Sequence, residues 1–139
     1  MDSKEDKKRF SILARINSAT HAWRGLGLVL KTSHNMWAGI CTSLLAIYLG
    51  FILNISNTEW LALIISIFLV FITETLNSAI EIDINLTSPE FHPYAKDTKD
   101  VAAGAVLLSA ILSVIVALFI FAPKILLYAN IYKYLWTIM

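Results

Sequence analysis

Three polar side chains stand close together inside an otherwise apolar stretch of the chain. Glu74, Asn77 and Glu81 are spaced i, i+3 and i+7, which places them on one face of a helix, and Asn85 extends that face by another turn. Counted from Trp60, Glu74 lies about 21 Å along such a helix, within the hydrocarbon of a bilayer. Because a charged side chain at that depth costs roughly 2.5–3.5 kcal/mol, a carboxylate there is a functional candidate.

More titratable groups follow where the next apolar run begins. Lys99 and Asp100 directly precede Val101, at a depth similar to that of Glu81. Phosphoryl transfer needs a divalent metal on the phosphates, a cation beside them and a carboxylate that accepts the proton of the attacking hydroxyl. Glu81, at the water boundary, suits the metal, and the deeper Glu74 suits the general base. On spacing alone, an ion or proton pathway along these carboxylates fits nearly as well.

The elements that must position these groups are three membrane-spanning helices. The chain carries no charge at 37–55 or at 101–122, and 60–80 is apolar apart from Glu74 and Asn77. Each run approaches the roughly 20 residues that a helix needs to cross the hydrocarbon, and none alternates as a barrel strand would. We therefore expect an all-α membrane protein with spans at these three ranges.

Lysine and arginine predict the orientation of these spans. Residues 1–36 hold most of the eleven basic residues, Ser56–Glu59 between the first two spans holds none, and Ile82–Asp100 holds Lys96 and Lys99. The positive-inside rule therefore predicts a cytoplasmic N-terminus and a cytoplasmic second connection.

The segments that flank the spans are expected to lie at the membrane surface. Four apolar residues of segment 1–36 share one helical stripe: Leu13, Ile16, Trp23 and Leu30. With basic residues beside it, this stripe predicts an amphipathic surface helix, although a helix that only packs on the bundle fits about as well. Segment 123–139 is rich in Tyr and Trp after Pro123, which predicts an interfacial tail.

Composition excludes several classes of protein. Of the 139 residues, 58% are hydrophobic and 15% are charged, against roughly 25% charged in a typical soluble domain. This composition argues against an ordinary soluble domain and excludes a disordered chain. The net charge of +1 indicates no nucleic-acid partner. The single cysteine, Cys41, excludes an intramolecular disulfide and zinc sites built on several cysteines.

Two motifs carry a resemblance to a known family. The run Glu74-Thr-Leu-Asn-Ser-Ala-Ile-Glu81 and the later run Lys99-Asp-Val-Ala-Ala-Gly-Ala resemble the prokaryotic diacylglycerol kinase and undecaprenol kinase family over roughly residues 10–120. The family consists of small integral membrane proteins, usually homotrimers, that use MgATP to phosphorylate a lipid alcohol. The resemblance implies a surface helix plus three transmembrane helices, sites shared between protomers, and a place in the bacterial cytoplasmic membrane.

The resemblance also implies a role for each matching residue. Glu74 resembles the catalytic base, Asn77 lies beside the lipid hydroxyl, and Trp23 matches the tryptophan of the surface helix, on the side of the lipid substrate. Glu81 resembles a metal ligand, for Mg²⁺, that also touches the nucleotide. The other implied ATP contacts are Glu90, His92, Lys99 and Asp100.

Three positions depart from the family pattern. Ser33 stands ten residues after Trp23, where the family often has a Glu that completes the metal site. Asn85 replaces a common Asp, and Arg15 is displaced by one position from a nucleotide-contacting Arg. A Ser hydroxyl is a weak neutral ligand, so the metal site lacks one negative charge.

The expected function is ATP-dependent phosphorylation of undecaprenol or diacylglycerol at the cytoplasmic face. The run His92-Pro93-Tyr94-Ala95-Lys96 is similar to the undecaprenol kinase branch. The alternative is a catalytically weakened relative that binds lipid or nucleotide without turnover. The chain is thereby divided into a cytoplasmic segment 1–36, a kinase core 37–122 and a tail 123–139.

Overall fold

Four α-helices make up the part of the chain that the structure describes. The computed structural model describes the backbone of residues 12–138 and the side chains of residues 16–129. In chain order the helices are α1 (Ile12–Thr32), α2 (His34–Ile52), α3 (Asn57–Thr87) and α4 (Pro93–Ile138). The predicted all-α class is confirmed, and α2, α3 and α4 each contain a stretch that is long and apolar enough to cross a membrane.

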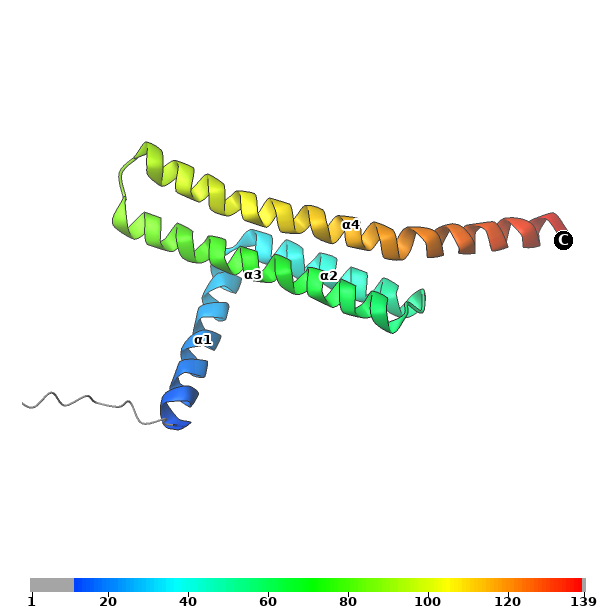
Figure 1. Ribbon diagram of the computed structural model, residues 1–139, viewed down its shortest axis with the longest axis horizontal. Coiled ribbons are helices and arrows are strands. Elements are labelled where there is room, and N and C mark those ends of the chain that lie inside the picture. Colours follow the sequence, from blue (N-terminus) through cyan, green and yellow to red (C-terminus); the bar gives the residue numbers. More distant parts are fainter. Residues whose placement is uncertain (1–11, 139) are drawn as a thin grey trace, which may run out of the picture.

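The three long apolar helices lie side by side, and α1 points away from them at the end where α2 begins (Figure 1). Helices α3 and α4 pack along much of their length, and the hydroxyls of Thr73 and Ser109 join them at 2.8 Å. On α1, Val29 near the bundle is buried, whereas Ile16 and Trp23 are exposed. Leu13 of the predicted stripe lies outside the described side chains, and the surface location of α1 stays a prediction.

The helices do not end where the apolar runs end, because the end of a helix and the end of an apolar run have different physical causes. Helix α2 stops at Ile52, before the predicted limit of 55. Helix α3 continues past residue 80 to Thr87. Its last turns are polar, and a helix can continue beyond the apolar run that crosses the membrane. Helix α4 begins at Pro93, a residue suited to a first helical turn.

Helix α4 also continues through Pro123, where the sequence suggested a break before a separate tail. A proline removes one backbone hydrogen bond, but in lipid the remaining backbone groups have no partners outside the helix, so the helix is kept. The backbone of 123–138 is therefore helical. The side chains beyond residue 129 lie outside the described part, and the interfacial role of the tail stays a prediction.

The turn between α2 and α3 is tight and fully capped. Asn54 adopts a left-handed conformation, with φ of 47°, and the amides of Asn54 and Ile55 donate to the carbonyls of Phe51 and Gly50 at 3.3 and 3.2 Å. This pattern satisfies the last carbonyls of α2. Ser56 then caps α3 in a reciprocal pair with Glu59. The turn therefore occupies residues 53–56, earlier than the predicted Ser56–Glu59.

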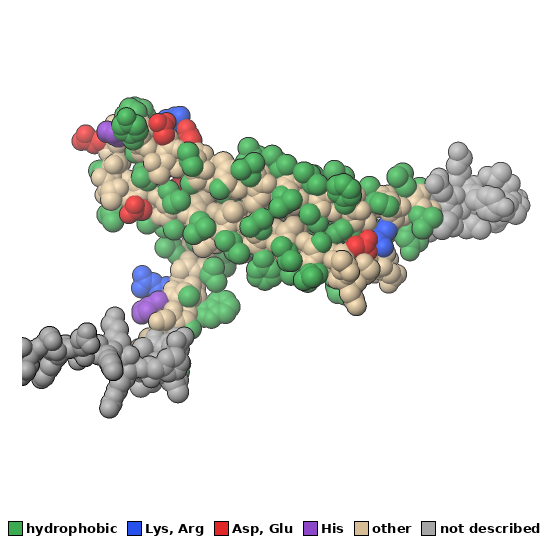
Figure 2. All heavy atoms as spheres, viewed as in Figure 1, with side chains coloured by type: hydrophobic (Ala, Val, Ile, Leu, Met, Phe, Trp, Pro, Cys, Tyr) green, Lys and Arg blue, Asp and Glu red, His purple; other side chains and the backbone are tan. Residues whose placement is uncertain are grey.

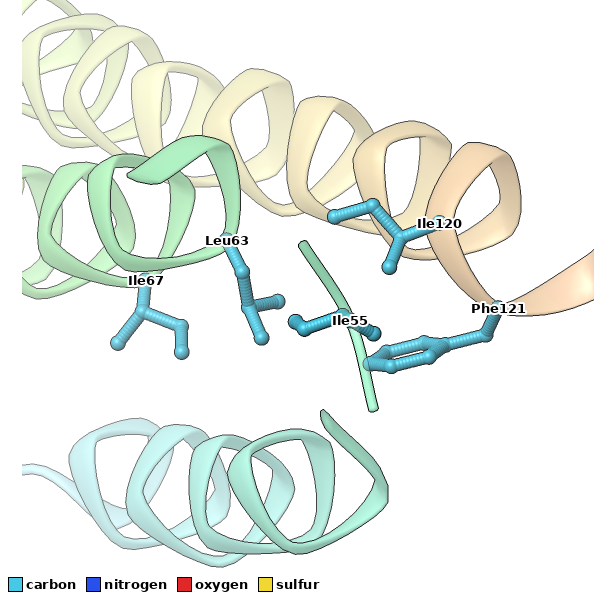
Figure 3. Packing of buried hydrophobic residues seen from close by; sticks show 5 residues of the cluster. All are labelled: Ile55, Leu63, Ile67, Ile120 and Phe121. Carbon is cyan, nitrogen blue, oxygen red and sulfur yellow. The ribbon is translucent and has the colours of Figure 1, made fainter. Parts of the chain in front are cut away.

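The main hydrophobic cluster lies at the end of the bundle that holds this turn. Figure 3 shows its five residues, which come from the turn, from α3 and from α4: Ile55, Leu63, Ile67, Ile120 and Phe121. Leu63 is only 1% exposed. The cluster fixes α4 against the α2–α3 hairpin, far from the connection between α3 and α4.

The outer surface of the bundle is apolar, and the charges gather at its ends. Figure 2 shows hydrophobic side chains over the length of the bundle and most of the acidic ones near the connection between α3 and α4. At the other end Lys124 and Glu59 form an ion pair of 3.3 Å. Large apolar residues such as Leu108 and Phe119 are mostly exposed. This distribution is typical of a bundle that crosses a bilayer.

Candidate active site

Glu74 is a buried carboxylate on α3. Its side chain is only 3% exposed, and its Oε1 accepts a hydrogen bond of 2.6 Å from the hydroxyl of Ser33. Its other oxygen, Oε2, is buried and has no hydrogen-bond partner among the described residues. A buried polar atom without a partner is rare and calls for an explanation, such as a ligand.

A cavity of about 270 Å³ opens beside this carboxylate between α2, α3 and α4. Apart from Glu74, its lining is neutral: Asn35, Met36, Ala38, Gly39, Thr42, Val70, Phe71, Val106 and Ala110. Such a cavity suits the end of a lipid better than a free phosphate, because the cavity itself offers no positive charge.

Asn77 and Glu81 continue the polar face toward the end of the bundle. Asn77 is 6% exposed, and its Nδ2 donates to Oε1 of Glu81 at 3.2 Å. The Oδ1 atom of Asn77 is buried without a partner among the described residues. Glu81 is exposed. The predicted face is therefore present, running from the buried Glu74 to the exposed Glu81.

The connection between α3 and α4 forms a hollow of about 310 Å³. Three of the predicted nucleotide contacts line it, namely Glu90, His92 and Lys99. The Nζ atom of Lys99 donates to Oδ1 of Asn85 at 2.7 Å, across the two helices. Asp100 and Glu81 do not line the hollow, and Asp100 accepts a hydrogen bond of 2.8 Å from Lys96 instead.

Trp23 lies on α1 and is 74% exposed. It lines an apolar groove of about 560 Å³ between α1, α2 and α3. Met36 and Phe71 line both this groove and the cavity at Glu74. The two spaces are therefore neighbours, with Trp23 in the lining of the groove and Glu74 in the lining of the cavity.

Comparison with known proteins places the chain in a family. The model of the prokaryotic diacylglycerol kinase family matches residues 20–121. The chain belongs to the prokaryotic diacylglycerol kinase family. It is 35% identical to an undecaprenol kinase from Bacillus subtilis, over 90% of this chain and 100% of that protein. It is 36% identical to a diacylglycerol kinase from Synechocystis, over 78% of this chain and 63% of that protein.

As a member of this kinase family, the chain is indicated to be a lipid kinase of a bacterial membrane with ATP as phosphate donor. The matched range begins within α1 and ends near the C-terminal limit of the predicted third span. It therefore includes Ser33, all the polar residues of α3 and the hollow at the start of α4.

The donor set for a metal is small in this member of the kinase family. Within the described residues, no three His, Cys, Asp or Glu side chains gather closely enough to hold a metal ion. Glu81 offers one exposed carboxylate, already in contact with Asn77. Since Mg²⁺ is commonly held by one or two carboxylates together with phosphates and water, Glu81 fits a metal that arrives with the nucleotide.

Two contacts of this site were not predicted from the sequence. One is the bond from Ser33 to Glu74, and the other is the bond from Lys99 to Asn85. The sequence indicates one of the two roles of Ser33, because a serine just before an apolar helix is a typical N-cap. Its second partner depends on how α2 packs on α3, which no local pattern gives.

Proposed function

We propose that the protein transfers the γ-phosphoryl group of ATP to the hydroxyl of a membrane lipid alcohol at the cytoplasmic face. The observation that carries the proposal is the buried Oε2 of Glu74, which has no donor among the described residues. A lipid hydroxyl would supply that donor, and the carboxylate is the group that can take its proton. The basic residues near the connection between α3 and α4 support the cytoplasmic placement of this end.

Glu74 acts as the general base of the reaction. The alcohol donates its O–H to Oε2, and the proton passes to that oxygen as the alcohol oxygen forms a bond to the γ-phosphorus. The bond between the γ-phosphorus and the β–γ bridging oxygen breaks, and ADP leaves. Glu81 is the side chain that would hold Mg²⁺, which when bound would neutralise phosphate charge.

The lipid lies along the apolar groove with its hydroxyl in the cavity at Glu74. Met36 and Phe71 line both spaces, so the groove and the cavity adjoin, which supports this placement of the lipid. Trp23 contacts the chain of the lipid, and Asn77, one turn from Glu74 on the same face of α3, approaches the hydroxyl from outside the cavity lining. Undecaprenol and diacylglycerol both fit this description. The undecaprenol kinase relative matches along its whole length, which favours undecaprenol.

The nucleotide binds at the hollow between α3 and α4. Glu90, His92 and Lys99 line it, and Lys99 supplies the positive charge for the phosphates. Glu81 and Asp100 lie outside this hollow within one chain. We propose that they reach the nucleotide in a homotrimer, where one protomer contributes the hollow and its neighbour contributes Glu81 of α3 and Asp100 of α4.

A phosphorylation assay tests the proposal. Purified full-length protein in mixed micelles receives radiolabelled ATP and either undecaprenol or diacylglycerol. We expect label in at least one lipid, and Glu74→Gln should lower the rate at least a hundredfold by removing the base. Glu59→Gln is the matched control, since it alters a carboxylate at the other end of α3 and should keep the rate. Label that survives Glu74→Gln would refute the role of Glu74.

One observation favours a second candidate, a weakened relative that binds lipid or nucleotide without turnover. Ser33 stands where the family often has a metal-binding Glu, so the site has one charge fewer. This candidate predicts no label in either lipid at high Mg²⁺, while a fluorescent ATP analogue still binds in competition with ATP. Label in either lipid excludes it.

A further inference from the structure

Ser33 makes two directed hydrogen bonds at the junction of three helices. It is the single residue between α1 and α2 and caps the start of α2, because its Oγ accepts from the amide of Met36 at 3.1 Å. The same hydroxyl donates to Oε1 of Glu74 at 2.6 Å. An amide can only donate, so the hydroxyl proton is free to be directed at the carboxylate.

These two bonds leave Glu74 with one oxygen held and one oxygen available. Oε1 is occupied by Ser33, while Oε2 faces no donor in the described part of the chain. Asn35 and Thr42 also line the cavity beside Glu74, but among the described residues only Ser33 forms a hydrogen bond to the carboxylate. A short hydrogen bond from a hydroxyl to a carboxylate is among the stronger ones, so it fixes the side chain well.

We propose that Ser33 is a positioning residue that aims Oε2 of Glu74 at the lipid hydroxyl. This inference rests on the proposed function, since it gives Glu74 the role of base. It also changes the meaning of the departure at position 33. The serine does not leave a gap in a metal site; it holds the base directly, and the metal is left to Glu81 and the phosphates.

The proposal and the weakened-site alternative predict opposite effects for an acidic residue at this position. Ser33→Glu puts a second carboxylate against Glu74 and removes the donor to Oε1, so the proposal expects kcat to fall at least tenfold. If Ser33 instead marks a missing acidic ligand in the metal site, the added carboxylate should raise activity. Activity of S33E above that of the wild type would overturn the proposal.

Conservative variants separate positioning from helix capping. Ser33→Thr keeps the hydroxyl and should retain activity within about threefold. Ser33→Gly and Ser33→Ala lack it, and glycine is the better tolerated of the two at an N-cap. Both should lower kcat about tenfold or more with the KM for ATP little changed. Ser56→Ala, which removes the equivalent cap of α3 at the far end, should lower thermal stability without lowering kcat.

A measurement that needs no turnover completes the test. In protein labelled with carbon-13 at glutamate carboxyls, the Glu74 resonance is assigned by its loss in Glu74→Gln. We expect this resonance to shift in Ser33→Ala and Ser33→Gly, but to stay in place in Ser56→Ala. If the wild type transfers no phosphate, the proposed function fails while this shift still decides whether Ser33 holds Glu74. An unshifted resonance, or a kcat unchanged in both variants, would overturn the proposal.

Discussion

Lys99 of α4 donates a hydrogen bond of 2.7 Å to Asn85 of α3, and this bond joins the two helices next to the connection between them. Both residues line the hollow that Glu90 and His92 share. The bond therefore holds the ammonium group at the hollow, where we propose that the phosphates of the nucleotide bind. Lys96 also lines this hollow, but its ammonium group is paired with Asp100 in an exposed ion pair.

Replacing Lys99 should weaken nucleotide binding more than replacing Lys96. Lys99→Ala removes the cation directed into the hollow, and we expect the KM for ATP to rise about tenfold. Lys96 also lines the hollow, but its charge is already paired with Asp100 in an exposed ion pair of small energetic contribution, so Lys96→Ala should change the KM less than threefold. Steady-state kinetics at saturating lipid measure both. Equal effects of the two variants would contradict a specific role for Lys99.

Glu81 should set the requirement for the divalent metal. Glu81→Gln removes a charged oxygen ligand, so the Mg²⁺ concentration for half-maximal activity should rise about tenfold or more. Asp83→Asn removes the same charge from a nearby exposed position of α3 and serves as the control. A magnesium titration at fixed ATP distinguishes them, and excess EDTA should abolish the activity of the wild type. An unchanged titration in Glu81→Gln would rule out Glu81 as the ligand.

Gly50 should be required for the close approach of α2 and α3. A Cβ at this position would lie 2.7 Å from the ring of Trp60 and 3.1 Å from Ile55, so Gly50→Ala should lower the free energy of unfolding by about 1–3 kcal/mol. Gly25→Ala is the control, because a Cβ there meets nothing within 4 Å and a helical alanine adds about 0.5–1 kcal/mol. Denaturation in detergent measures both, and a Gly50→Ala protein as stable as the wild type would show that the hairpin can open.

The backbone conformation of Asn54 leads to a further prediction, about the turn between α2 and α3. Its φ of 47° suits glycine or asparagine, so Asn54→Gly should leave the stability nearly unchanged. Asn54→Val places a branched side chain in the left-handed region and should cost about 1–2 kcal/mol. The same denaturation assay compares the two variants. Similar stabilities would mean that the turn can adopt another conformation.

The sequence predicts the parts of this fold that depend on local chemistry. Long uncharged runs require helices in lipid, and the spacing of Glu74, Asn77 and Glu81 gives a polar face that the structure contains. The ends of the helices were less predictable, because they depend on backbone caps. The left-handed Asn54 ends α2 early, and Pro123 fails to end α4.

The contacts between helices could not be predicted, because they depend on packing. Sequence spacing grouped Lys99 with Asp100, yet the first bonds to Asn85 and the second to Lys96. Likewise Ser33 was recognisable as a departure from the family pattern, but its partner is 41 residues away in sequence. Only the placement of α2 against α3 brings these two side chains together.

The junction of α1 and α2 couples the position of α1 closely to that of Glu74. A single residue, Ser33, separates the two helices, and that residue also holds the carboxylate. When α1 tilts or lifts, Ser33 must follow it or distort the start of α2. A change in the angle of α1 would therefore be transmitted to Glu74. At the predicted membrane surface, the exposed apolar side chains of α1 would make this angle depend on the surrounding lipids.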